Sequence, residues 1–244
     1  MERATRKTGP EGVDGVKCSG VAWRGDGCYY SRVPQPDAAK QLTTRDANQK
    51  VYYHKLGTQQ SEDTLVYEPA DPSYYVSVDT TEDERFAFLQ VQNPSKRGNT
   101  LAVRDESRGE KAFRPIIAEF SDDSFDPVDN IGDKVVVSTN RGAPNRKLML
   151  YDPTKPDEKD WTTFLPEKSE RLEYVSPAGG KLFVTYLKDV AAHTYVYDRR
   201  GMLENEIAFP GPGTATGFVG RKDERELFYV FTSMNYPPTT FRYD

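Results

Sequence analysis

An aspartate that closes a short segment of alternating apolar residues returns at nearly equal intervals along this chain of 244 residues. The four segments are residues 101–105, 148–152, 195–198 and 241–244, so the closing aspartates lie 47, 46 and 46 positions apart. A period of about 40–50 residues is typical of one four-stranded blade of a β-propeller. The spacing therefore favours a fold built from repeated sheets.

A second, independent feature repeats with a similar period. Dipeptides that suit tight turns each join two runs of β-branched and aromatic residues. They are Asp26-Gly27, Glu82-Asp83, Gly132-Asp133, Gly179-Gly180 and Lys222-Asp223, spaced 56, 50, 47 and 43 residues apart. Two repeating features in the same order predict five copies of one unit, in which the first pair of strands forms a hairpin.

Each unit is interpreted as four successive strands, and in the third unit they are expected at 125–130, 134–139, 147–151 and 161–165. The predicted fold class is all-β, a single β-propeller domain over 1–244 with five four-stranded blades, either a closed five-blade ring or an open arc. The blades are expected at about 17–69, 70–120, 121–166, 167–210 and 211–244. The fifth unit stops after its third strand, so the leading segment 1–16 is a candidate for the closing strand.

The charge balance argues against two classes of partner. Lys and Arg number 33 against 38 Asp and Glu, a formal net charge of −5, and no dense basic run supplies the footprint that phosphates require. No apolar run approaches the ~20 residues of a membrane-spanning helix, and no leader peptide is recognisable. We therefore predict neither nucleic-acid nor membrane binding, and the cell compartment stays undetermined.

The residues that usually carry catalysis are scarce. The chain has two histidines and two cysteines, and it lacks the Gly-x-Ser-x-Gly pentapeptide of α/β-hydrolases. His54 is expected inside a strand over 51–56, and His193 beside a turn ahead of the third strand of the fourth unit. Cys18 and Cys28 are expected to be free thiols. We predict no catalytic residue, no metal site and no cofactor.

Three segments resemble the propeller of the prolyl oligopeptidases, serine peptidases that cleave after proline. They are Lys-Cys-Ser-Gly-Val-Ala-Trp at 17–23, Tyr-Tyr-His-Lys-Leu-Gly-Thr-Gln-Gln-Ser-Glu-Asp at 52–63, and Phe-Thr-Ser at 231–233, of which the middle one is the most specific. The resemblance extends from about residue 17 to residue 244. It implies the last five of the seven blades of that family, without the α/β-hydrolase domain that holds the catalytic triad.

The resemblance also implies a function and a small set of site residues. The propeller of that family covers the active site and admits short peptides, so we expect a non-catalytic module whose partner is the missing hydrolase domain. Substrate-lining positions of the family fall at Cys18, Tyr75 and Gln92, and a neutral Gln92 replaces an arginine of the animal enzymes. Short proline-containing peptides are then expected to bind at millimolar strength or weaker, ~−4 kcal/mol.

Two further expectations complete the sequence analysis. The parent protein of such a module is expected in the cytoplasm or the periplasm, and an open arc of blades is expected to self-associate. The alternative hypothesis is a stand-alone or engineered propeller that acts as a binding or assembly scaffold.

Overall fold

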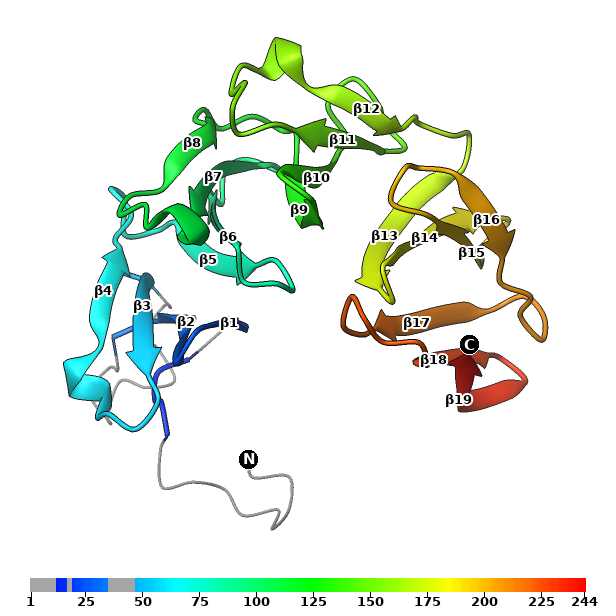
Figure 1. The fold of residues 1–244 in the computed structure, drawn as a ribbon, viewed down its shortest axis with the longest axis horizontal. Helices are drawn as coiled ribbons and strands as arrows, with labels where there is room; N and C mark the ends of the chain where they lie inside the picture. Colours follow the sequence, from blue (N-terminus) through cyan, green and yellow to red (C-terminus); the bar gives the residue numbers. More distant parts are fainter. Residues whose placement is uncertain (1–11, 17–18, 35–46) are drawn as a thin grey trace. The chain divides into compact units, whose positions relative to one another are not determined.

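Antiparallel strands follow one another in chain order through the computed structural model, which describes residues 12–16, 19–34 and 47–244 (Figure 1). The chain divides into two units, Met1–Asp122 and Asp123–Asp244. In both units each strand pairs with its neighbours in sequence, so every sheet is a simple meander. Turns and short loops are sufficient to connect such strands.

The described residues of the first unit form two four-stranded sheets and two short 3₁₀ helices. The first sheet consists of β1 (Val21–Arg24), β2 (Gly27–Arg32), β3 (Lys50–Lys55) and β4 (Thr64–Tyr67). The second sheet consists of β5 (Tyr75–Thr80), β6 (Phe86–Gln92), β7 (Asn99–Asp105) and β8 (Arg114–Ile117). The helices are η2 (Gln60–Glu62) and η3 (Glu106–Arg108).

The second unit contains three sheets and the 3₁₀ helix η4 (Glu158–Asp160). Its first sheet consists of β9 (Phe125–Ile131), β10 (Lys134–Thr139), β11 (Lys147–Tyr151) and β12 (Thr162–Leu165). Its second sheet consists of β13 (Arg171–Ala178), β14 (Lys181–Lys188), β15 (Ala191–Tyr197) and β16 (Leu203–Glu206). Its third sheet has three strands, β17 (Thr214–Val219), β18 (Leu227–Ser233) and β19 (Tyr236–Tyr243).

The prediction of an all-β fold built from propeller-type sheets is confirmed. The described residues form five sheets, four with four strands and the last with three, as the repeat predicted. In the third repeat the strand bounds differ from the expected ones by one residue at most. Closure into a ring stays a prediction, because most of the leading segment 1–16 lies outside the described residues.

The second strand of each of the first four sheets lies in the interior. Strands β2, β6, β10 and β14 each carry a nearly continuous run of buried residues. Such a run means that both faces of the strand are covered, as in a stack of sheets. In the first unit, for example, Tyr29 of β2 and Val76 of β5 belong to one buried apolar cluster, each 2% exposed. Stacked apolar faces therefore hold neighbouring sheets together within that unit.

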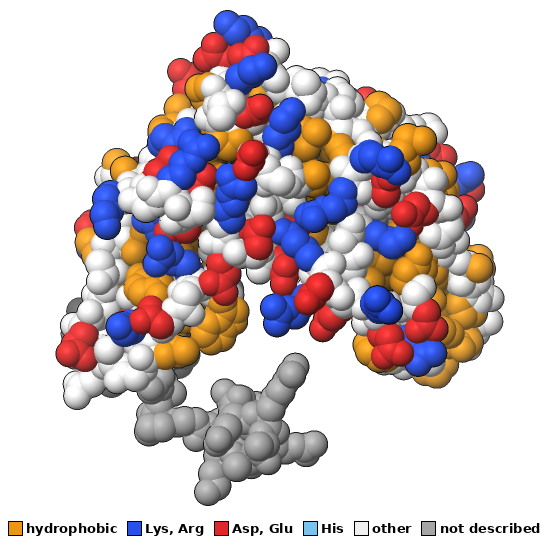
Figure 2. All heavy atoms as spheres, viewed as in Figure 1, with side chains coloured by type: hydrophobic (Ala, Val, Ile, Leu, Met, Phe, Trp, Pro, Cys, Tyr) orange, Lys and Arg blue, Asp and Glu red, His pale blue; other side chains and the backbone are white. Residues whose placement is uncertain are grey.

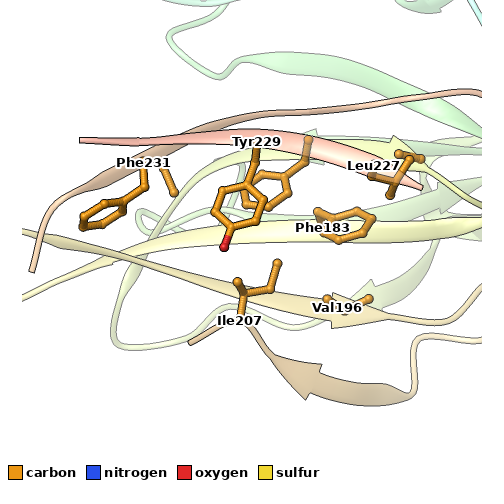
Figure 3. Close-up of a cluster of buried hydrophobic side chains, with 9 residues drawn as sticks. Phe183, Val196, Ile207, Leu227, Tyr229 and Phe231 are labelled. Atoms are coloured by element: carbon orange, nitrogen blue, oxygen red, sulfur yellow. The ribbon is translucent and has the colours of Figure 1, made fainter. Parts of the chain in front are cut away.

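An aromatic cluster joins the last two sheets of the second unit (Figure 3). Phe183 of β14 is fully buried, and its ring stacks on Phe218 of β17 with 5.2 Å between the centroids. Tyr243 meets the same ring edge-on, also at 5.2 Å. Offset stacking and edge-to-face contacts are the arrangements that aromatic rings prefer. This cluster is the main apolar contact between these two sheets.

Strand β18 has a different pattern from the other second strands. Its sequence Leu-Phe-Tyr-Val-Phe is continuously apolar, yet Leu227, Tyr229 and Phe231 are buried while Phe228 is 53% exposed. Alternating burial is the signature of a strand covered on one face only. The face of the last sheet that carries Phe228 is therefore the more exposed of its two faces.

Three of the four repeated aspartates share one structural role. The Oδ1 atom of Asp105, of Asp152 and of Asp198 accepts a hydrogen bond from the backbone N–H two residues further on, which forms an Asx turn. The donors are Ser107 for Asp105 (3.1 Å), Thr154 for Asp152 (2.9 Å) and Arg200 for Asp198 (2.8 Å). Hydrogen bonds lower the pKa of both Asp152 and Asp198 below the usual value for aspartate, first from the Thr154 hydroxyl for Asp152 and from the Met202 N–H for Asp198. The repeat therefore reflects a recurring turn after the third strand.

The first hairpin turn differs by one residue from its prediction. The turn residues are Gly25 and Asp26, since Arg24 pairs with Gly27 across the ladder. Gly25 has φ +58°, a left-handed conformation that glycine adopts without steric cost. Gly27 is needed for a different reason, because a Cβ there would lie 2.2 Å from the carbonyl oxygen of His54. The predicted Asp26-Gly27 turn is wrong because close packing, and not turn geometry, selects glycine at position 27.

Charged side chains of both signs are interspersed on the face that Figure 2 shows. This distribution agrees with the absence of a long basic run in the sequence. In the part of the chain that the structure describes, no helix has the length and apolar character needed to cross a membrane.

Candidate functional site

Two of the three sequence-predicted site residues face each other across one strand pair. Tyr75 is the first residue of β5 and Gln92 is the last of β6, and the two are direct partners in the antiparallel ladder. Partners in such a ladder present their side chains on the same face of the sheet. Tyr75 is 42% exposed and Gln92 is exposed as well. An aromatic ring and a neutral amide are therefore available together to a ligand.

The strand that carries Tyr75 is fixed by buried polar side chains of the first sheet. The backbone N–H of Val76 donates to Oε1 of Gln49 at 2.8 Å, and the Ser31 hydroxyl donates to the Val76 carbonyl at 2.7 Å. Gln49 and Ser31 are 3% and 1% exposed. Hydrogen bonds between buried groups are costly to leave unmade, so they define one position for the start of β5.

The third predicted residue, Cys18, lies outside the described residues. Its chain neighbour Ser19 is described, and Oγ of Ser19 accepts a hydrogen bond from the backbone N–H of Ser31 at 2.8 Å. Ser31 in turn bonds to Val76, which follows Tyr75. The segment next to Cys18 is thus linked through two hydrogen bonds to the strand that carries Tyr75, and the assignment of Cys18 stays a prediction.

A groove of about 740 Å³ lies beside Tyr75. Two Asx turns shape its walls, because Asp71 Oδ1 accepts from the Ser73 N–H at 2.8 Å and Asn93 Oδ1 accepts from the Ser95 N–H at 2.9 Å. The hydroxyl and then the N–H of Ser73 lower the pKa of Asp71. The lining residues are Ala47, Asp71, Ser73, Tyr74, Tyr75, Asn93, Pro94 and Ser95. Polar side chains and two tyrosine rings therefore line this groove together.

Side-chain contacts within and around residues 52–63, the segment with the most specific resemblance, hold this segment to the first sheet. His54 Nδ1 contacts Asp63 Oδ1 at 2.7 Å, and the Tyr30 hydroxyl donates to Asp63 Oδ2 at 2.5 Å. His54 lies in β3 as predicted and is 5% exposed. Burial and the Asp63 carboxylate raise the pKa of Tyr30 to about 12. The motif therefore ties the loop after β3 to the sheet beneath it.

The remaining histidine and the described cysteine are placed as follows. His193 lies within β15, so the prediction that it precedes this strand is wrong; the strand begins earlier, at Ala191. Its Nδ1 contacts Glu206 Oε1 at 2.8 Å across the β15–β16 ladder. Cys28 is a buried free thiol, as predicted, and burial together with Asp63 raises its pKa. Over the described residues, no cluster of three or more potential metal ligands is present.

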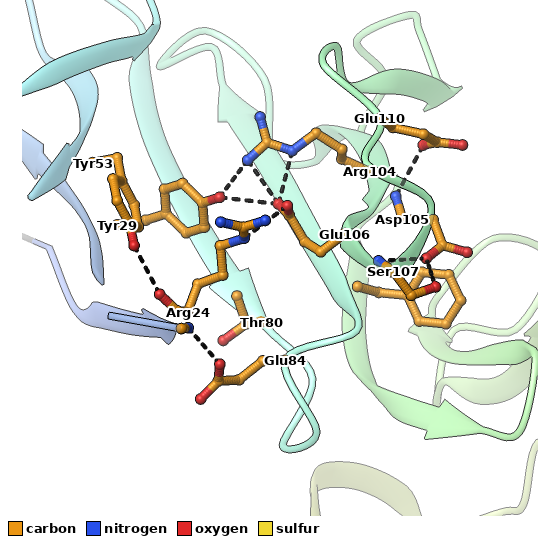
Figure 4. Close-up of polar contacts among 12 residues, drawn as sticks. Arg24, Tyr29, Tyr53, Thr80, Glu84, Arg104, Asp105, Glu106, Ser107 and Glu110 are labelled. Atoms are coloured by element: carbon orange, nitrogen blue, oxygen red, sulfur yellow. Dashed lines mark hydrogen bonds and ion pairs between the residues drawn. The ribbon is translucent and has the colours of Figure 1, made fainter. Parts of the chain in front are cut away.

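The sequence analysis missed a buried charge network at the other end of these strands (Figure 4). Glu106 contacts Arg24 at 2.8 Å and Arg104 at 2.7 Å, and it accepts a hydrogen bond from the Tyr29 hydroxyl at 2.9 Å. The Glu106 side chain is only 7% exposed. The partners are up to 82 positions apart in sequence, so no local pattern signals the network. It connects the first sheet to the second.

Comparisons with known proteins identify the family. Residues 1–244 match the model described as "Prolyl oligopeptidase, N-terminal beta-propeller domain". The chain is 36% identical over 246 residues to a prolyl endopeptidase of Elizabethkingia meningoseptica, which covers 100% of this chain and 34% of that protein. It is 30% identical over 251 residues to a dual function macrocyclase-peptidase of Galerina marginata, covering 96% of this chain and 34% of that protein.

Solved structures give the same result. A prolyl endopeptidase structure superposes with a TM-score of 0.84 at 29% identity, over 94% of this chain and 34% of that chain. Prolyl oligopeptidase B of Galerina marginata, bound to a 35mer substrate, superposes with a TM-score of 0.84 at 28% identity, over 94% and 33%. This chain belongs to the prolyl oligopeptidase family and corresponds to its β-propeller. It spans about a third of the length of these relatives.

Proposed function

We propose that this chain is the non-catalytic propeller module of a prolyl oligopeptidase, which covers the active site and filters short peptides for cleavage after proline. The observation that carries the proposal is the match of all 244 residues to the propeller domain of that family. In homologues, the propeller sits in the same chain as a catalytic α/β-hydrolase domain. The partner of this module is then such a domain.

Tyr75 and Gln92 supply the contact with the peptide. The Tyr75 ring offers an apolar face for a proline ring, and the Gln92 amide offers a donor and an acceptor for the peptide backbone. A neutral amide forms weaker hydrogen bonds than a guanidinium, so the contact orients the peptide but contributes little affinity. Millimolar binding suits a filter, because substrates have to pass on to the reaction site.

The rigidity of the stacked sheets supports a role as a size filter. A size filter has to keep its shape in order to exclude large molecules, and close-packed apolar interiors have low compressibility. The fully buried side chains of β6 and β10, for example Phe86 and Val136, provide such an interior in each unit. The described histidines contact carboxylates, Asp63 and Glu206, and the proposal assigns peptide hydrolysis to the partner domain.

An NMR titration with acetyl-Gly-Pro-amide tests the peptide contact. We expect millimolar binding that is weakened about five- to tenfold by Tyr75→Ala, which removes the ring. Gln92→Arg should tighten binding about fivefold, since it adds a charge-assisted hydrogen bond. Thr162→Arg, on the exposed side of β12, adds the same charge elsewhere and serves as the matched control.

Two results would contradict this assignment. The peptide contact is wrong if neither Tyr75→Ala nor Gln92→Arg changes the affinity beyond the change seen with Thr162→Arg. It is also wrong if the peptide causes no shift in the amide signals of β5 and β6 at concentrations of ~10 mM, well within the range where millimolar binding is visible.

A further inference from the structure

A second groove of the first unit has a different chemical character. It has a volume of about 430 Å³ and lies where β2 ends and β3 begins. Its lining residues are Asp14, Arg32, Val33, Pro34, Asn48, Lys50, Tyr52 and Gln60. Neither Tyr75 nor Gln92 is among them. The groove is polar, with two basic side chains and one acidic side chain in its wall.

The Arg32 side chain is clamped in one position at this groove. Its guanidinium carbon lies 4.2 Å from the centroid of the Tyr52 ring. Gly15 packs against the aliphatic part of the Arg32 side chain. A Cβ at position 15 would lie 3.0 Å from Cγ of Arg32 and 2.9 Å from the Val33 carbonyl oxygen. Gly15 also has φ +74°, which disfavours any other residue. The guanidinium is thus oriented before a ligand arrives.

The segment that clamps Arg32 is itself fixed. Gln60 Oε1 accepts from the Asp14 N–H at 3.1 Å, while Gln60 Nε2 donates to the Asp14 carbonyl at 2.9 Å. The same Nε2 donates to the hydroxyl of Tyr30 at 3.0 Å, and Tyr30 is 2% exposed. One glutamine of the family motif therefore joins the wall of the groove to the buried interior. A preorganised wall reduces the entropy that binding has to overcome.

Arg32 differs in its charge pairing from the other basic residues of this region. Lys50 pairs with Glu68 at 2.8 Å, and Arg24 pairs with Glu106. No carboxylate of the described chain forms an ion pair with Arg32. The field of Asp63 reaches it, but both oxygens of Asp63 accept hydrogen bonds from Tyr30 and His54. Arg32 also donates a side-chain hydrogen bond to Tyr52. Because a guanidinium carries several N–H donors in a planar fork, others remain for a planar carboxylate.

We propose that this groove binds the free carboxylate of a short peptide, with Arg32 as the charged partner and Tyr52 as its support. The inference rests on the proposed function for the class of ligand, a peptide, and adds a preference for peptides that carry a free carboxyl end. Lys50 at the same opening is already paired with Glu68, and Asp14 in the wall disfavours a second negative charge. A monoanionic peptide is therefore the ligand that the groove fits.

The test compares acetyl-Gly-Pro, which has a free carboxylate, with acetyl-Gly-Pro-amide. The readout is the Nε–Hε signal of Arg32 in NMR spectra, assigned by its loss in Arg32→Lys. We expect the carboxylate form to shift this signal with a millimolar Kd and the amide to have no effect on it. Arg32→Gln removes this signal, so its affinity is followed by the backbone amide signals of β2 and β3, and it should weaken binding of the carboxylate form about tenfold, the size of one lost charge-assisted hydrogen bond.

Arg97→Gln is the matched control, since it removes the same charge from an exposed position of the same unit. The inference is overturned if both peptides shift the Arg32 Nε–Hε signal with the same Kd. It is also overturned if Arg32→Gln and Arg97→Gln change the affinity for acetyl-Gly-Pro by the same factor. The two proposals fail in distinguishable ways. If the proposed peptide contact is wrong, Tyr75→Ala leaves binding of acetyl-Gly-Pro-amide unchanged. If acetyl-Gly-Pro is still preferred in that case and the preference depends on Arg32, the carboxylate site at the groove is supported.

Discussion

Glu106→Gln is expected to lower the free energy of unfolding by about 3 kcal/mol, because it leaves two guanidinium groups without their buried counter-charge. Arg104 is 10% exposed at its side chain and lies 4.5 Å from the centroid of the Phe113 ring, so water compensates little for the loss. The Tyr29 hydroxyl loses a charged acceptor in the same substitution. Urea unfolding followed by circular dichroism measures the change.

Glu119→Gln provides the control for this prediction. Glu119 is exposed in the same unit, so its substitution should alter stability by less than about 0.5 kcal/mol. A loss below about 1 kcal/mol for Glu106→Gln, the range of an exposed ion pair, would contradict the view that this network connects the first sheet to the second.

Phe183→Ala is expected to destabilise the chain by about 3–5 kcal/mol. The ring is fully buried and is packed between Phe218 and Tyr243, so its removal leaves a cavity between the last two sheets of the second unit. The cavity adds its own cost to the lost transfer free energy. The measurement is again the free energy of unfolding in urea. Its slope against urea concentration shows whether the surface exposed on unfolding has changed as well.

The matched control for Phe183 is the same substitution at Phe228, which is 53% exposed. We expect Phe228→Ala to cost less than about 1 kcal/mol, because little apolar area is withdrawn from water at that position. Equal losses at the two positions would mean that the last sheet is not held by the aromatic cluster shown in Figure 3.

The repeat and the strands could be read from the sequence because they depend on local patterns. Short apolar runs between turn residues locate each strand within a few positions, as for β10 (Lys134–Thr139). The Asx turn explains why an aspartate such as Asp152 closes the third strand. The first turn was misplaced by one residue, since the requirement for glycine at position 27 comes from packing against His54 of another strand. Local patterns contain no information about such contacts.

The resemblance named Tyr75 and Gln92, which are 17 positions apart, and the structure pairs them across β5 and β6. Their role in binding a ligand stays a prediction. The resemblance did not indicate the Gln49 and Ser31 side chains that hold this strand, or Arg32 and its clamp. These contacts join residues that are brought together only when sheets stack. The 52–63 motif indicated the family, and its histidine and aspartate contact each other inside the first unit.

Incubation of the purified chain with a chromogenic Gly-Pro amide tests the proposed division of roles most directly. We propose that this chain contacts the substrate and that a partner domain hydrolyses it, so we expect no turnover above the buffer blank. Turnover that a serine-directed inhibitor abolishes would contradict it.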